Sequence, residues 1–102
     1  MKHYLENEEI KLLLFRAYFL YGKSKYGSAE RGDIRLARIA ACRGVMQLCR
    51  LLLSAKEERI PLARAEAGFA QLRQQAEHLG EGAFKQTCLE TLTALQDSLL
   101  DI

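Results

Sequence analysis

The chain has 102 residues, of which 49% are apolar and 27% are charged, and its formal net charge is +2. This length predicts one domain with a modest core, and this composition excludes a disordered chain. The isoelectric point of about 8.5 lies below the range typical of nucleic-acid-binding domains, so nucleic acid is disfavoured as a partner. We therefore expect a single folded domain over residues 1–102.

No segment of the chain predicts a membrane span. A helix that crosses a bilayer needs about 20 consecutive apolar residues. The apolar run at residues 10–21 is shorter and contains Lys11 and Arg16. The first residues, MKHYLENEE, are too acidic for a signal peptide. These features predict a cytoplasmic protein with no membrane partner.

Four helices are predicted in chain order, joined by short polar or glycine-containing segments. They span residues 6–21, 34–55, 61–79 and 83–102. Asp33 is a favourable N-cap for the second helix, and Pro61 suits the first turn of the third. Gly80 and Gly82 mark the turn before the fourth. Because no segment alternates between apolar and polar residues, we predict no strand.

Apolar residues in the last two helices repeat at spacings of three and four, which places them on one stripe of each helix. The third helix carries Leu62, Ala65, Phe69, Leu72, Ala76 and Leu79, and the fourth carries Cys88, Leu92, Leu95, Leu99 and Ile102. Short connections between amphipathic helices favour alternating directions. The sequence therefore predicts an all-α fold, a small antiparallel bundle of about four helices.

The second helix carries two apolar stripes on roughly opposite sides. One consists of Ile34, Ala37, Ala41, Leu48 and Leu52, and predicts a side that faces the core. The other consists of Ile39, Cys42, Met46, Cys49 and Leu53, and it shares its side with several arginines. Two interpretations are open. The helix is central in its own bundle, or the second stripe is a docking surface.

The docking hypothesis assigns partner binding to Ile39, Cys42, Arg43, Met46, Cys49, Arg50 and Leu53. Apolar residues would contact an amphipathic or disordered segment of another chain, and the two arginines would favour an acidic one. A second copy of the chain is another possible occupant, which would make a homodimer. The first helix has a similar excess of apolar residues at 10–21, for which burial in the core is the favoured interpretation.

Few residues of the sequence suggest a catalytic, metal-binding or redox role. Cys42 and Cys49 lie about 10 Å apart along one helix, too far for a disulfide. Buried free thiols in a reducing cytosol are favoured over a metal or redox role. Arg73 and His78 form an Arg-x4-His pattern that resembles the motif of HEPN ribonucleases, small all-α dimers. We predict no cofactor, no metal site and no enzyme activity.

"LLLFRAY" opens the first helix, and "ERGDIRLA" opens the second. These two stretches resemble the starts of the first two helices in the FliS family of flagellar export chaperones. The matching residues are Leu14, Phe15, Gly32, Asp33, Ile34 and Ala37. The resemblance covers residues 10–55 and implies a small cytoplasmic helical bundle that holds a disordered export substrate.

These observations favour a non-enzymatic protein-binding module. It would be a chaperone of the type III or flagellar export kind, or a regulatory adaptor, that holds a helical or disordered segment of a partner. The alternative is a small HEPN-like ribonuclease or a helical nucleic-acid-binding protein.

Overall fold

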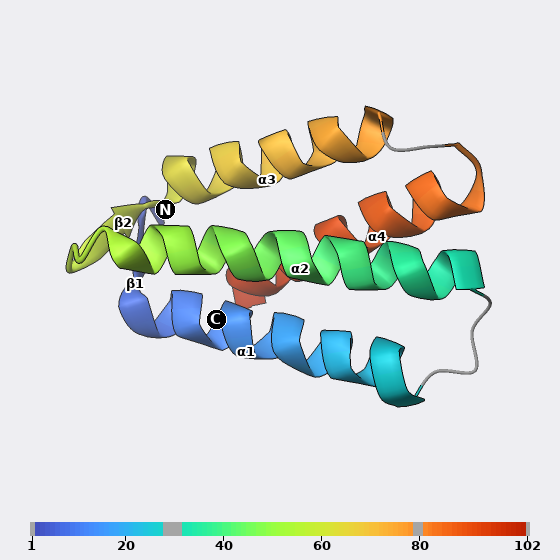
Figure 1. The fold of residues 1–102 in the computed structure, drawn as a ribbon. Coiled ribbons are helices and arrows are strands. Elements are labelled where there is room, and N and C mark those ends of the chain that lie inside the picture. The colour runs from blue at the N-terminus through green and yellow to red at the C-terminus, as the bar shows by residue number, and fades with distance from the viewer. Residues whose placement is uncertain (1, 28–31, 79–80, 102) are drawn as a thin grey trace.

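The computed structural model describes residues 2–27, 32–78 and 81–101, most of which lie in four helices. The helices are α1 (Asn7–Gly22), α2 (Gly32–Ser54), α3 (Leu62–His78) and α4 (Ala83–Asp97). Successive helices run in opposite directions, and α2 lies between α1 and α3 with α4 behind it (Figure 1). The prediction of a small all-α antiparallel bundle is confirmed.

The local signals at the helix ends account for most boundaries. Asp33 lies in the first turn of α2 rather than before it. Its negative charge still stabilises the helix there, because it interacts favourably with the positive end of the helix dipole. Pro61 directly precedes α3, and Gly82, with a positive φ of 69°, directly precedes α4. The predicted positions Leu79, Gly80 and Ile102 lie outside the described residues.

Two short strands were not predicted. β1 (Tyr4–Glu6) pairs antiparallel with β2 (Arg59–Pro61), so the expectation of no strand is wrong. Leu5 lies opposite Ile60 in this pair, and both side chains are buried in the core. Three residues are too few to show an alternating pattern, and the pairing joins segments far apart in the chain. The strands tie the start of α1 to the start of α3.

Arginine side chains close the ends of two helical segments. The guanidinium of Arg16 donates to the carbonyl of Ser98, 3.0 Å away, where α4 passes into the short 3-10 helix η2 (Ser98–Asp101). Arg35 donates to the carbonyls of Ser24 and Lys25 in the π-helix η1 (Lys23–Gly27). Both arginines thus place a positive charge on carbonyls near the C-terminal end of a helical segment, where the helix dipole favours it.

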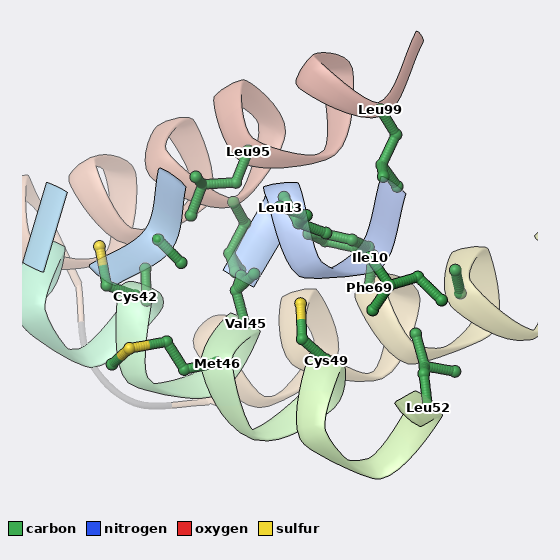
Figure 2. Close-up of a cluster of buried hydrophobic side chains, with 14 of the residues drawn as sticks. Ile10, Leu13, Cys42, Val45, Met46, Cys49, Leu52, Phe69, Leu95 and Leu99 are labelled. Atoms are coloured by element: carbon green, nitrogen blue, oxygen red, sulfur yellow. The ribbon is translucent and has the colours of Figure 1, made fainter. Parts of the chain in front are cut away.

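The core lies where α2 meets the other three helices. Figure 2 shows Leu13 of α1, Val45 of α2 and Leu95 of α4 in one cluster. From α1 the core takes Ile10, Leu13 and Ala17, at the helical spacing of three and four. The rest of the apolar residues of α1 are only partly buried or exposed. Full burial of that helix, as its composition suggested, is therefore not observed, because α1 lies at the edge of the bundle.

Two glycines allow α2 and α3 to approach closely. A Cβ atom at Gly44 would lie 2.8 Å from the Leu72 side chain, and one at Gly68 would lie 2.3 Å from the Leu48 side chain. Each helix thus contributes a glycine and, four residues later, a leucine that fits over the glycine opposite. This reciprocal arrangement fixes how the two helices are aligned along their length.

Candidate protein-binding surface

The seven residues of the predicted docking stripe do not share one environment. Cys42, Met46 and Cys49 are 0%, 5% and 0% exposed and belong to the core of the chain itself. Figure 2 draws all three on α2 among the side chains of the core. The reason is the central position of α2, whose second apolar stripe is covered within the bundle. Very little of these three side chains is therefore accessible to a partner of the folded chain.

The other four residues of the stripe lie at or near its rim. Ile39 and Leu53 are half-buried, whereas Arg43 and Arg50 are exposed. Both arginines point along the junction of α2 with α1, where a cleft of about 330 Å³ is lined in part by Tyr18, Tyr21 and Met46. Arg43 and Arg50 are thus the exposed residues of the predicted surface, and they form a basic border along this cleft.

Each exposed arginine is paired with a tyrosine of α1. The guanidinium carbon of Arg50 lies 5.3 Å from the centre of the Tyr18 ring, and its nitrogen donates to the Tyr18 hydroxyl. The guanidinium carbon of Arg43 lies 5.6 Å from the Tyr21 ring, and its nitrogen donates to the Tyr21 hydroxyl at 3.3 Å. Cation–π contact and hydrogen bonding together hold both positive charges at the α1–α2 junction.

The Tyr21 hydroxyl lies between two cations. It accepts hydrogen bonds from Arg43 and from Lys25, each at 3.3 Å. These bonds, that from Arg43 foremost, lower the pKa of the Tyr21 phenol because they favour its ionised form. Lys25 also lies 5.4 Å from the centre of the Tyr26 ring. The end of this junction near η1 is therefore rich in positive charge.

The outer side of α1 adds an apolar surface that the docking hypothesis did not include. Phe15 and Phe19 are 66% and 63% exposed, and Leu12 is 38% exposed. On a helical wheel the three fall within about 60° of one another, and Tyr18 lies beside them on the side of α2. Large apolar side chains that gather on one exposed side commonly mark a binding site.

A signal for this surface was present in the sequence. Ile10, Leu13 and Ala17 alone supply a complete core stripe for a helix of this length, so Leu12, Phe15 and Phe19 form a second one. The prediction that the first helix is buried in the core is therefore wrong for its outer side. We name the combined surface the α1–α2 face. It consists of Leu12, Phe15, Tyr18 and Phe19 of α1 with Arg43 and Arg50 of α2.

The two residues of the catalytic alternative lie on different sides of α3. Arg73 reaches the hydroxyl of Thr93 at 3.5 Å, and His78 is exposed at the end of α3. Their positions on one helix differ by about 140°, which does not direct both side chains to one point. Among the described residues no cluster of three or more His, Cys, Asp or Glu side chains is arranged to hold a metal.

The three cysteines are free and buried. Burial raises the pKa of the Cys42 thiol to about 11 and that of Cys49 to about 12, and it raises the pKa of Cys88 as well. A thiol that stays protonated and enclosed is a poor nucleophile and a poor metal ligand. In the folded chain, these thiols serve as apolar packing.

The residues that carry the FliS resemblance occupy mixed environments. Gly32 and Asp33 begin α2, and Ala37 is buried in the core. Leu14 is half-buried, whereas Phe15 is exposed on the α1–α2 face.

Comparisons with protein families, with curated proteins and with solved structures found no match to this chain. Across the described part of the chain, no helix has the length and apolar character needed to cross a membrane.

Proposed function

We propose that this chain is a cytoplasmic, non-enzymatic protein-binding module that holds an acidic amphipathic segment of another protein on its α1–α2 face. The observation that carries the proposal is the exposure of Phe15 and Phe19 next to the basic border formed by Arg43 and Arg50. Export chaperones and regulatory adaptors both work by holding such segments, and the resemblance to FliS supports the former.

The face combines the two properties that this mode of recognition needs. Leu12, Phe15 and Phe19 offer an apolar stripe against which the apolar side of a partner helix can pack. Aromatic residues and arginines are the types most enriched where interfaces bind tightly. Because Arg50 and Tyr18 are already held together, little side-chain entropy remains to be lost when a carboxylate binds there.

The positive charge of the surrounding region favours a partner segment with negative charge. Residues 11–50 carry nine Lys or Arg and two acidic residues. Lys23, whose ammonium nitrogen lies 5.9 Å from the centre of the Phe19 ring, extends the positive charge along α1. Complementary charge speeds association and rejects partners of the wrong sign. A segment with apolar residues on one side and Glu or Asp on its flanks fits this face best.

Two synthetic peptides test the proposal. Both are helical, about 18 residues or five turns long, and share one leucine stripe, but one has glutamates at its flanks and the other lysines. We expect the glutamate peptide to bind at least about tenfold more tightly, as measured by fluorescence anisotropy at low salt. Replacing Phe15 and Phe19 with alanine should weaken the binding of both peptides.

Charge reversal separates the face from general attraction to a basic protein. Arg43→Glu with Arg50→Glu should abolish the preference for the glutamate peptide. Arg59→Glu with Arg64→Glu changes the net charge equally at exposed positions outside the face and should leave that preference largely intact. Equal loss in both double variants, or equal binding of the two peptides to the unaltered protein, would contradict the proposal.

A further inference from the structure

We infer that two copies of the chain pair through the outer side of α1, with their α1 helices antiparallel. The residues that carry the inference form what we call the outer stripe: Glu8, Leu12, Phe15 and Phe19 of α1, with Lys23, which directly follows α1 as the first residue of η1. All five are exposed, and their spacings of four, three, four and four residues place them within about 80° on a helical wheel. The stripe therefore presents an apolar centre with a negative charge at one end and a positive charge at the other.

This order of charges is complementary to itself only in one direction. Two antiparallel α1 helices with a two-fold axis between positions 15 and 16 place Glu8 opposite Lys23 of the second copy. The same symmetry places Leu12 opposite Phe19 of the second copy and brings the two Phe15 side chains to the axis. Each contact then occurs twice, as an interface between identical surfaces requires.

A parallel pair would oppose like charges at both ends of the stripe, Glu8 with Glu8 and Lys23 with Lys23. The antiparallel pair replaces these two repulsions with two ion pairs. Within the described residues Glu8 makes no ion pair, and Lys23 lies along the stripe beside Phe19 rather than against an acidic group. Both charges are thus available at the ends of the apolar centre.

The second copy and the proposed acidic partner would share Leu12, Phe15 and Phe19 but depend on different charges. Self-pairing depends on Glu8 and Lys23, whereas Arg43 and Arg50 lie outside the outer stripe. Binding of a partner and self-pairing would then exclude each other. The inference does not rest on the proposed function, since either occupant could bind this face without the other.

Sedimentation equilibrium over a wide range of protein concentrations tests the inference by charge exchange. We expect the unaltered protein to dimerise, and Glu8→Lys or Lys23→Glu alone to weaken the dimer by about tenfold or more, because each reversal turns two attractions into repulsions. The double variant Glu8→Lys with Lys23→Glu should restore the dimer to within about threefold, since it re-forms both ion pairs in reverse.

Three controls make the result decisive. Glu66→Lys makes the same change of net charge as Glu8→Lys at an exposed position of α3 and should not alter the dimer. Arg43→Glu with Arg50→Glu should also leave it intact, which separates failure of this inference from failure of the acidic-partner proposal. Thermal melting checks that each variant is folded. A protein that is monomeric throughout, or a dimer that the single reversals leave unchanged or the double variant does not restore, would overturn the inference.

Discussion

At the scale of single residues, burial decides what the sulfur-containing side chains do. Cys42 and Cys49 are fully enclosed on α2, and neither forms a disulfide. A cysteine in such surroundings behaves as a small apolar residue. Its measurable effect is then the free-energy cost of ionising the thiol in the folded state.

That cost predicts how stability depends on pH. The ordinary thiol pKa is 9.0, and burial raises it to about 11 at Cys42 and about 12 at Cys49. Between pH 9 and pH 11 the unfolded chain releases thiol protons that the folded chain keeps, so these thiols favour unfolding as the pH rises. Each contributes a slope of up to about 1.4 kcal/mol per pH unit.

The measurement is urea denaturation of the unaltered protein and of Cys42→Ala with Cys49→Ala, at several pH values from 8 to 11. The double variant will be less stable at pH 8 because of the cavities it leaves, but its stability should fall less steeply above pH 9. All other ionisable groups are the same in both proteins, so their contributions cancel in the comparison. Parallel curves would show that the two thiols are not enclosed as the structure has them.

At the scale of elements, the close approach of α2 and α3 depends on residues without side chains. A methyl group at Gly68 would come within 2.3 Å of one Leu48 carbon and 3.2 Å of another. A leucine in this position has to change rotamer or move with its helix. By contrast, Gly22 at the end of α1 has no neighbouring atom within 4 Å of such a methyl group.

Alanine substitutions at these two glycines should have opposite effects on stability. Gly22→Ala gains helix propensity in open space and should stabilise the fold by about 0.5 kcal/mol. Gly68→Ala gains the same propensity but displaces Leu48, and should destabilise the fold by about 1 kcal/mol net. Thermal melting distinguishes the two, and a rise in melting temperature for both variants would mean that α2 and α3 are not in close contact.

At the scale of the whole molecule, the two apolar sides of α2 are both internal. Met46 is 5% exposed among residues of the core, whereas Phe15 on the outer side of α1 is 66% exposed. The same apolar-to-acidic change therefore has different consequences at the two positions. A buried carboxylate costs several kcal/mol, which is comparable to the total stability of a small domain.

We expect Met46→Glu to lower the melting temperature by about 20 °C or more, or to prevent folding. Phe15→Glu should change it by only a few degrees while abolishing association through the α1–α2 face. Circular dichroism melts and light scattering on the two variants provide the comparison. If Met46→Glu melts at the same temperature as the unaltered protein, the second apolar stripe of α2 is exposed to solvent and not part of the core.

The class of fold and most helix ends could be predicted from the sequence, because these depend on local chemistry. The spacing of Leu62, Ala65 and Phe69 reports one stripe of α3 whatever lies opposite, and Pro61 and Gly82 act on the backbone at their own positions. The strand pair was beyond such signals, since Leu5 and Ile60 meet only after the chain has folded.

Which apolar stripe is covered depends instead on how the helices pack against one another. The first two helices each carry two stripes, and hydrophobicity alone does not distinguish a stripe that meets a neighbouring helix from one that meets solvent. Because α2 lies at the centre of the bundle, Cys42, Met46 and Cys49 are buried in the core. Because α1 lies at the edge, Phe15 and Phe19 are exposed. Of the predicted binding residues, only Arg43 and Arg50 are exposed. The exposed apolar side chains next to them, Phe15 and Phe19, belong to the neighbouring helix α1.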